Sequence, residues 1–502
     1  MPKKKKIQWF QLSQRQRMSP FPNYLSMESI GKEMKNVIGV AYRRIVLLFE
    51  ENHMYLYFDK ADHERVGRTV LKKVYKQPDM FIRLGKRQKA FAKSFYIFLK
   101  KNNNPIKLKS VSNSHLAGLH EEYVKRYKQV YSNYFPVLAM ENYLFKYLQK
   151  YIATKESDSK KAAHYVDALI TETSAMVNRQ ENLASLRLCI TIGKKKKWEN
   201  YFKGGINASV KLIKKDKELF RLMRNHEKKF FWITRDYDDP ILTFEDFIKR
   251  FKKRLRNNPA RALDKVLREE KEIKNAITEI HKKLNIDKKH QRLFQTMREG
   301  IYYKELRKSI VSQTLYYYDP ILLEIARRAG LSLRQARHLR TEDVRPMLTK
   351  DIDMSDSLNE RIKLGAFIME NGKTNLYTGK KAQAYHKKFV EIDKSIKELV
   401  GMAVSPGIAK GPVKIVINPD AFHKVKKGDI IATLQATPVF TQVLSIASAL
   451  ICDGGPGITS HPATLAREAG IPGIIGLRMT TKILKDGQIV EVDGNNGTVK
   501  IK

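Results

Sequence analysis

Residues 453–473 read DGGPGITSHPATLAREAGIPG, and the rest of the chain is organised around this stretch. A glycine loop leads to two hydroxyl residues and His461, and residues 462–469 predict a short helix. Pro462 suits the first helical position, because the N–H that proline lacks would have no intrahelical acceptor there. His461 is therefore predicted at a helix N-terminus, beside unpaired N–H donors and the positive end of the helix dipole. Such a place favours an anion, and phosphate is the first candidate.

The spacing of these residues resembles that of a known family. The segments GxTSH at 457–461, ARE at 466–468 and GIP at 470–472 resemble the phosphohistidine swivelling, or mobile, domain of phosphoenolpyruvate-utilising enzymes. Upstream, residues 401–413 resemble the beginning of that domain and residues 428–431 resemble its second strand. Because these segments agree in their order, the resemblance covers about residues 400–502.

The resemblance implies a catalytic role for His461, the best candidate among the 12 histidines. In that family the histidine at this position carries a phosphoryl group between two separated active sites. Neutral imidazole is a nucleophile near neutral pH. The helix-terminal N–H groups and the hydroxyls of Thr459 and Ser460 would hold the phosphoryl group. The competing interpretation is a capping histidine in a structural loop, and the surrounding residues favour the carrier.

Two more residues belong to the predicted phosphate site. Gly457 has no side chain, so its backbone can approach a ligand closely. Arg467 falls on the predicted helix, where it either reaches the phosphate or serves in a surface ion pair or in support of the fold, and both interpretations stay open. No metal ligands are predicted. The other polar groups lack metal-ligand spacing, and those at 238–240 are typical of a turn; these groups are Asp236, Asp238 and Asp239, and the pair His53 and His63.

Length and composition limit the class of protein. A chain of 502 residues with 42% hydrophobic residues is long enough for about two to four domains with packed cores. It has no apolar run long enough to span a bilayer, and its N-terminus lacks the apolar stretch of a signal peptide. Only Cys189 and Cys452 occur, which favours a reducing environment. We therefore expect a soluble cytoplasmic protein with no membrane partner.

The net charge of +44 is unevenly distributed. Residues 401–502 contain 11 Lys and Arg against 7 Asp and Glu, a net of +4, which leaves +40 for residues 1–400. Glycine divides the other way, with 13 of the 26 in the last 102 residues. Two different kinds of domain are therefore predicted to meet near residue 400. We predict a basic helical domain at 1–289, a helical segment with a hairpin at 290–399, and the swivelling domain at 400–502.

The fold class follows from periodicity. From about residue 62 to residue 346 the pattern is mostly helical, and Tyr123, Tyr127, Tyr131 and Tyr134 fall on one helical face. Residues 37–49 are β-branched and aromatic, but a short apolar run fits either strands or a buried helix.

Residues 367–377 predict a hairpin with an Asn-Gly type I′ turn, and a helix is expected near 379–399. Beyond residue 401, strands alternate with short helices, which predicts a small sheet with helices packed on it. The fold class is therefore multidomain, with a mainly α-helical N-terminal region and a C-terminal α/β domain. Arg298-Glu299, residues 341–344 and Thr378-Gly379 follow one another in a known order. Through them the segment at 290–399 also resembles the helical segment before the swivelling domain in phosphoenolpyruvate synthases and antibiotic phosphotransferases.

The resemblance also implies partners. Complete enzymes of the family carry a nucleotide-grasp domain, and many carry a barrel that binds phosphoenolpyruvate. Residues 1–400 contain no Walker-type loop and only 13 glycines, too few for a nucleotide-grasp domain. We therefore expect a phosphotransferase or phosphocarrier component that works with a separate nucleotide-grasp protein and a small-molecule phosphoryl acceptor. ATP or phosphoenolpyruvate is the expected donor, and Mg²⁺ is implied at the partner or acceptor site.

The basic region permits a second hypothesis from a different class. Residues 194–203 and 228–232 interleave lysines with aromatic residues, a pattern typical of single-stranded nucleic-acid sites. In that case the chain binds nucleic acid or another polyanion, or an acidic partner protein, and its mobile domain no longer acts in catalysis. The ordinary alternative is that the lysines are solvated surface residues and the aromatics lie in the core.

Overall fold

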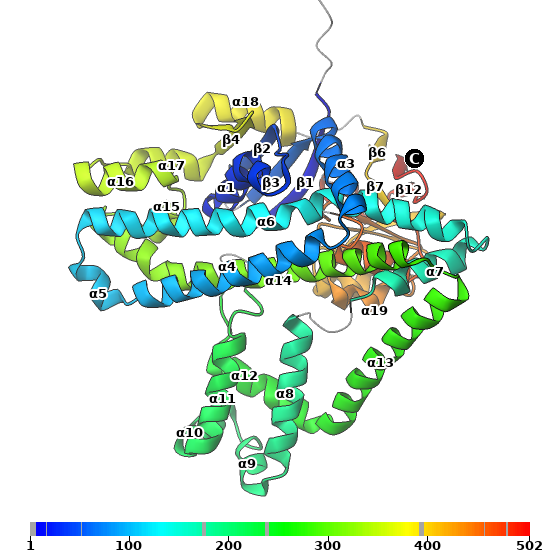
Figure 1. Ribbon diagram of the computed structural model, residues 1–502, viewed down its shortest axis with the longest axis horizontal. Helices are drawn as coiled ribbons and strands as arrows, with labels where there is room; N and C mark the ends of the chain where they lie inside the picture. Colours follow the sequence, from blue (N-terminus) through cyan, green and yellow to red (C-terminus); the bar gives the residue numbers. More distant parts are fainter. Residues whose placement is uncertain are drawn as a thin grey trace, which may run out of the picture. The chain divides into compact units, whose positions relative to one another are not determined.

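The computed structural model describes residues 7–16, 18–51, 53–172, 177–235, 240–390, 396–455, 457–477 and 480–502. The N-terminal lysine run, the turn predicted at Asp238 and Asp239, and Asp236 lie outside these residues. The chain folds as two compact units (Figure 1). The first contains residues 1–73, 104–145 and 320–502, and the second contains residues 74–103 and 146–319.

The described residues of the second unit form helices joined by loops and turns, with no strand among them. Its helices, wholly or mostly within this unit, are α4 (Met80–Asn102), α7 (Ser159–Ile170), α8 (Val177–Gly193), α9 (Lys196–Tyr201), α10 (Ile206–Lys215), α11 (Lys217–Phe230), α12 (Phe244–Arg256), α13 (Pro259–Lys283) and α14 (Lys288–Arg328). Helices α8 to α12 close around a core of aromatic and aliphatic side chains (Figure 1). Thr243 followed three residues later by Asp246 is a sequence pattern that predicts the start of a helix, and the structure confirms it. Thr243 is the N-cap of α12, where its hydroxyl accepts the Asp246 backbone N–H and the Asp246 carboxylate accepts the Thr243 backbone N–H.

The aromatic residues of the basic segments lie inside this unit. Trp198, Phe202 and Phe230 belong to the core of α8 to α12, and Trp198 donates its indole N–H to Asp216 at 2.9 Å. Phe231 and Trp232 are buried as well. The lysines at 194–197 are exposed. The structure therefore supports the interpretation in which the aromatics form the core and the lysines form the solvated surface, and none of these five aromatic rings offers an exposed face on which a base could stack.

The first unit opens with helices and an antiparallel sheet that the helical pattern did not reveal. The sheet has the order β1-β3-β2-β4-β5. Its strands are β1 (Trp9–Gln16), β2 (Arg44–Glu50), β3 (His53–Asp59), β4 (Gly365–Glu370) and β5 (Lys373–Tyr377). The helices of this part are α1 (Pro20–Glu28), a π-helical turn (Ser29–Glu33), α2 (Met34–Ile38), α3 (Lys60–Lys76), α5 (Pro105–Ser110), α6 (Asn113–Ala153), α15 (Leu333–Ala336), α16 (Thr341–Lys350), α17 (Ser355–Lys363) and α18 (Gly379–Val390).

Helices cover both faces of this sheet. On one face, α18 packs on β2, β3 and β4, and Tyr57 donates its hydroxyl to the Phe389 carbonyl at 2.8 Å. On the other face, Phe58 of β3 meets Phe135 of α6 with ring centroids 5.8 Å apart. The four tyrosines predicted on one face of a helix are all buried on α6, so that prediction is confirmed.

The hairpin predicted at 367–377 is confirmed, with strands β4 and β5 paired from Ala366–Tyr377 to Glu370–Lys373. Asn371 and Gly372 have φ of 51° and 82°, the positive values that a type I′ turn requires. The ambiguous stretch 37–49 resolves into the end of α2, a turn at Gly39 and strand β2. The helix predicted near 379–399 ends as α18 at Val390, and residues 398–400 form a strand instead.

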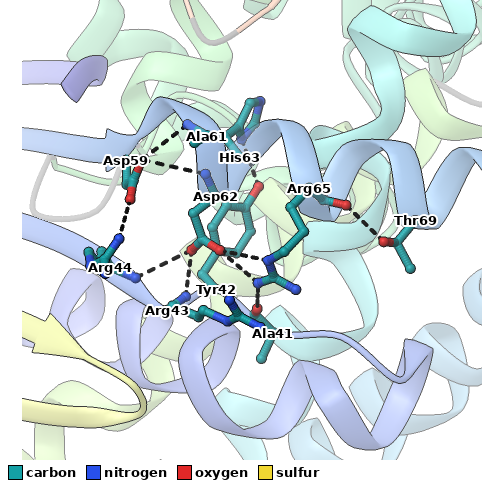
Figure 2. Close-up of polar contacts among 10 residues, drawn as sticks. All are labelled: Ala41, Tyr42, Arg43, Arg44, Asp59, Ala61, Asp62, His63, Arg65 and Thr69. Carbon is teal, nitrogen blue, oxygen red and sulfur yellow. Dashed lines mark hydrogen bonds and ion pairs between the residues drawn. The ribbon is translucent and has the colours of Figure 1, made fainter. Parts of the chain in front are cut away.

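A buried polar network joins β2, β3 and the start of α3 (Figure 2). Asp62 accepts hydrogen bonds from the backbone N–H of Arg43 at 2.5 Å and from the Arg65 guanidinium at 2.7 Å. Asp59 accepts the N–H of Ala61 at 3.0 Å, which satisfies an orphan donor at the start of α3. The Tyr42 hydroxyl lies 2.8 Å from Nδ1 of His63. These contacts fix the angle at which α3 leaves the sheet.

Two buried histidines are expected to make the first unit less stable in acid. Burial lowers the pKa of His63 from 6.5 to about 4, although Asp62 opposes the shift, and burial lowers the pKa of His120 in the same way. Between pH 6.5 and 4 each histidine therefore binds more protons in the unfolded chain than in the folded one. The contribution of the neutral histidine to folding stability is fully present above its pKa in the unfolded chain, and it is lost as the pH falls toward 4. Each histidine is expected to remove about 3 kcal/mol across this window.

Urea denaturation at several pH values tests this expectation. The midpoint should fall between pH 7 and pH 5, and His63→Gln, which removes one titrating group, should make the fall less steep. An unchanged slope in His63→Gln would show that the buried imidazole does not set the acid sensitivity.

The C-terminal part of the first unit is a second sheet of order β6-β13-β12-β8-β9-β10-β11-β7. Strands β8, β9, β10 and β11 run parallel, and the others pair antiparallel. The strands are β6 (Glu398–Val400), β7 (Met402–Ser405), β8 (Ile408–Ile415), β9 (Ile430–Thr433), β10 (Ala449–Cys452), β11 (Gly473–Ile475), β12 (Ile489–Asp493) and β13 (Thr498–Ile501). The helices are two 3₁₀ turns (Pro419–Lys424 and Pro438–Phe440), α19 (Thr441–Leu444), α20 (His461–Glu468) and α21 (Thr480–Ile483).

Alternate side chains of β9 and β10 enter two different cores. Ile430, Ala432 and Ile451 face one core together with Leu484, next to α21, and Ile431 and Leu450 face the other core with α19 and α20. A mainly helical N-terminal region followed by a C-terminal α/β region is the predicted fold class, and it is confirmed.

Candidate functional site

The loop that precedes His461 leaves the carboxyl end of a parallel strand. Strand β10 ends at Cys452, the chain enters the glycine loop, and α20 returns it to β11, which pairs with β10 in parallel. In open parallel sheets, ligands bind in the region beyond the carboxyl ends of the strands. The fold therefore places the candidate loop where such sheets bind their ligands.

His461 is the first residue of α20, and its side chain is exposed. Ser460 is the N-cap residue, with φ −70° and ψ 156°. Pro462 is consequently the second helical residue and not the first, one position later than predicted. Proline is suited to the second position as well, because the second N–H of a helix also has no intrahelical acceptor. The exposed imidazole stands at the N-terminus of a helix, as expected.

The two hydroxyl residues have different surroundings. Thr459 donates its backbone N–H, at 3.0 Å, and its hydroxyl, at 2.6 Å, to the same carboxylate oxygen, Oε1 of Glu141 on α6. Ser460 is buried, and its Oγ has no hydrogen-bond partner among the described residues. In this conformation the Ser460 hydroxyl points away from solvent, so a role in phosphate binding requires the side chain to rotate.

Gly457 allows α6 to approach the loop. A Cβ atom built on Gly457 would lie 2.5 Å from Oε1 of Glu141, closer than real Cβ contacts allow. The next residue, Ile458, donates its backbone N–H to Oδ1 of Asn142 at 3.2 Å. The absent side chain at 457 thus allows the carboxylate of Glu141 to approach closely, and a role of Gly457 in phosphate binding stays a prediction.

Arg467 supports the loop from within the domain. Its guanidinium donates to the carbonyl of Ile458 at 2.9 Å and to that of Val404 on β7 at 3.4 Å, and it lies 5.6 Å from the ring centroid of Phe145. Of the two interpretations left open by the sequence, these contacts favour support of the fold. A role of Arg467 in phosphate binding stays a prediction.

Asp453 anchors the start of the loop, a role that the sequence did not indicate. It is buried and accepts hydrogen bonds from the N–H of Thr480, from the N–H of Thr481 at 3.2 Å and from the Thr481 hydroxyl at 2.6 Å, at the start of α21. Burial raises the pKa of the Asp453 carboxyl, although these hydrogen bonds oppose the shift.

Asp453→Ala is expected to lower the free energy of unfolding by about 2–4 kcal/mol, because three donors lose their acceptor inside the protein. Urea denaturation measures this effect. Asp453→Asn keeps one carbonyl oxygen at the site and should cost less. Equal unfolding free energies for Asp453→Ala and the unaltered protein would show that the carboxylate does not hold the loop in place.

The glycine, threonine, serine and arginine predicted to bind phosphate all lie on the loop before α20 or on α20 itself. The residues that sequence reasoning missed are Glu141 and Asn142, which contact the loop from more than 300 positions away in the chain. No feature of the local sequence marks them, since a Glu-Asn pair inside a helix is ordinary. Across the described ranges, no cluster of three or more His, Cys, Asp or Glu side chains could hold a metal ion.

Comparison with known proteins identifies the region that contains this loop. Residues 425–497 match the family described as the mobile domain of phosphoenolpyruvate-utilising enzymes. The predicted resemblance of the C-terminal region to the mobile domain of phosphoenolpyruvate-utilising enzymes is therefore confirmed.

Relatives that share a similar stretch include phosphoenolpyruvate synthases and a phosphotransferase. A probable phosphoenolpyruvate synthase of Archaeoglobus fulgidus is 36% identical over 138 residues, which cover 26% of this chain and 18% of that protein. The uncharacterized phosphotransferase YvkC of Bacillus subtilis is 43% identical over 103 residues, which cover 20% of this chain and 12% of that protein. The chain thus spans less than a fifth of the length of these curated relatives.

Among solved structures, aconitase X of Thermococcus kodakaraensis is 22% identical over a match that covers 21% of this chain and 98% of that one, with a TM-score of 0.17. A likeness at that score establishes neither a shared fold nor a shared activity. Searching the described helices for spans with the length and apolar character to cross a membrane finds none.

Proposed function

We propose that the chain is a phosphotransferase, or the carrier component of a split one, in which a phosphoryl group moves through His461. The observation that carries the proposal is an exposed imidazole at the first position of α20, inside a domain of the phosphoenolpyruvate-utilising family. The names of the relatives, phosphoenolpyruvate synthase and phosphotransferase, support the same class of reaction.

The reaction has two displacement steps. In the first, the lone pair of an imidazole nitrogen of His461 attacks the phosphorus of the donor, a P–N bond forms, and the P–O bond breaks with its electrons leaving on the donor oxygen. In the second, an acceptor hydroxyl attacks the same phosphorus, the P–N bond breaks with its electrons returning to the ring, and the hydroxyl proton passes to water. Backbone N–H groups at the start of α20 stabilise the charge on the phosphoryl oxygens.

The donor and the acceptor belong to the proposal as well. We propose ATP or phosphoenolpyruvate as the phosphoryl source, a separate nucleotide-grasp protein as the partner that would bind the nucleotide, and a small molecule as the acceptor. Mg²⁺ would act with the phosphates at those sites, where it would neutralise phosphoryl charge. The described residues of this chain present no ligand set that fits the ion, so no step above passes through it. The two cysteines are free and buried, which fits a reducing compartment such as the cytoplasm.

Labelling the protein tests this function. The purified chain is incubated with phosphorus-labelled ATP or phosphoenolpyruvate, alone and with a cell extract that can supply a missing partner. The proposal expects a label on the protein that is lost in acid and kept in base, as the P–N bond of phosphohistidine requires. A protein that stays unlabelled under all four conditions would contradict the proposal.

The charge distribution favours a second candidate, a binding protein for nucleic acid or another polyanion. Residues 1–400 hold +40 of the net charge, and the lysines at 194–197 are exposed. Since the nearby aromatic rings are buried, such binding would be electrostatic and independent of base identity. Affinity for a single-stranded oligonucleotide should then fall steeply between about 50 and 200 mM salt and be the same in His461→Ala. Weak or salt-insensitive binding would remove this candidate.

A further inference from the structure

Helix α6 contacts residues 457–460, the loop before His461, through a carboxylate. Glu141 is 2% exposed, and its Oε1 accepts both the N–H and the hydroxyl of Thr459, at 3.0 and 2.6 Å. Beside it, Asn142 accepts the N–H of Ile458 at 3.2 Å. Two consecutive backbone N–H groups of the loop are therefore bound by two consecutive residues of α6.

The groups that Glu141 occupies are those that a phosphoryl group would need. Thr459 lies two positions before His461, and its N–H and hydroxyl are donors that suit an anion. A carboxylate resembles a phosphate in charge and in its ability to accept several hydrogen bonds. Gly457 leaves space for this carboxylate, since a side chain there would collide with Oε1. The donors of Thr459 thus favour an anion, and the carboxylate of Glu141 is the group that they bind in this structure.

Charge decides how this contact responds to phosphorylation. A phosphoryl group on His461 adds about one and a half to two negative charges near neutral pH. It would compete with Glu141 for the donors of Thr459, and the two anions would repel each other. Without the phosphoryl group, the buried carboxylate keeps its hydrogen-bond donors and the contact is favourable.

We propose that Glu141 is a charge-sensitive positioning residue for the carrier domain. It holds the loop against α6 while His461 carries no phosphoryl group, and it releases the loop when His461 becomes phosphorylated. The inference rests on the proposed function, because it assumes that His461 becomes phosphorylated. Phosphorylation would then release the loop from α6. The neutral Asn142 adds hydrogen bonding to the contact but no response to charge.

Hydrogen–deuterium exchange of residues 457–460 in the full chain tests the inference without any phosphoryl donor. His461→Glu places a fixed negative charge at the site, and His461→Gln is its neutral control of the same shape. The exchange rate is expected to rise about tenfold or more in His461→Glu and in Glu141→Ala, and to stay near that of the unaltered protein in His461→Gln and Glu141→Gln. Glutamine at 141 keeps a carbonyl oxygen that accepts the Thr459 donors but carries no charge.

The decisive variant is the double substitution of Glu141→Gln with His461→Glu. If repulsion between two anions releases the loop, removing one of them should restore slow exchange. A loop that stays protected in His461→Glu, or a double variant that exchanges as fast as His461→Glu, would overturn the inference. A merely structural role for Glu141 cannot produce this rescue, because such a role does not depend on the charge at 461.

The result separates this inference from the proposed function. If His461 accepts a labelled phosphoryl group but a negative charge at 461 leaves the hydrogen–deuterium exchange of the loop unchanged, the proposed carrier function is supported and the proposed role of Glu141 is wrong. If charge at 461 releases the loop but no donor ever labels His461, the contact responds to charge and the proposed function fails.

Discussion

His461→Ala is expected to take up none of the acid-labile label that the unaltered protein acquires, a loss of at least about a hundredfold. The reason is chemical: alanine has no lone pair to form the P–N bond, and no neighbouring side chain on the loop can replace a neutral imidazole as a nucleophile near pH 7. The measurement is the amount of acid-labile, base-stable phosphate per protein after incubation with donor and extract.

The matched control is His423→Ala. His423 belongs to the same domain and is exposed like His461, but it lies on a 3₁₀ turn, where its Nδ1 is 2.7 Å from the Asp420 carbonyl. Labelling of this variant should equal that of the unaltered protein. Full labelling of His461→Ala would show that another residue accepts the phosphoryl group.

The second large effect concerns a buried ion pair between α16 and α17, the two helices that precede β4 in the chain. Arg361 of α17 lies 2.5 Å from Asp343 of α16 and also donates to the carbonyl of His338 at 3.1 Å. Both side chains are nearly inaccessible, at 6% and 5% exposure. Arg361→Ala would leave a buried carboxylate without its main cation, and we expect the free energy of unfolding to fall by about 3–5 kcal/mol.

The control for this variant is Arg345→Ala. Arg345 also pairs with a carboxylate, Glu121, at 2.7 Å, but the pair is on the surface with 42% and 44% exposure. Removing it should change the urea midpoint far less, since exposed ion pairs contribute little. Equal losses in the two variants would contradict the role assigned to burial.

The pH dependence of this pair has a definite sign. Burial alone would raise the pKa of Asp343, but the hydrogen bond and charge of Arg361 outweigh it and lower that pKa below the ordinary value. The pair therefore stabilises the protein at neutral pH, and the stabilisation is lost as the pH falls through the lowered pKa.

Local chemistry explains what the sequence could predict. The Asn-Gly pair at 371–372 determines a type I′ turn, the Thr243 capping box marks the start of α12, and the proline and glycines around His461 mark a loop that enters a helix. Each of these features depends on residues within a few positions of one another. For the same reason the mobile domain, whose motifs each lie within a few positions, was recognisable from the sequence, and the family match covers residues 425–497.

Long-range contacts explain what the sequence could not predict. Strand β2 pairs with β4 from more than 300 positions away, and nothing in residues 44–50 indicates that partner. The contact of Glu141 with Thr459 is of the same kind. The sequence also did not determine whether the aromatic residues of the basic segments are buried. The alternation of lysines with Trp198 and Phe230 fits both an exposed stacking surface and the amphipathic helices that the structure contains.

The central claim is that His461 carries the phosphoryl group, and locating the phosphate tests it most directly. After incubation with donor and extract, the chain is digested at alkaline pH, and mass spectrometry identifies the modified peptide and residue. The account predicts a phosphate on His461. A phosphate on any other residue, or none on the peptide that contains His461, would contradict it.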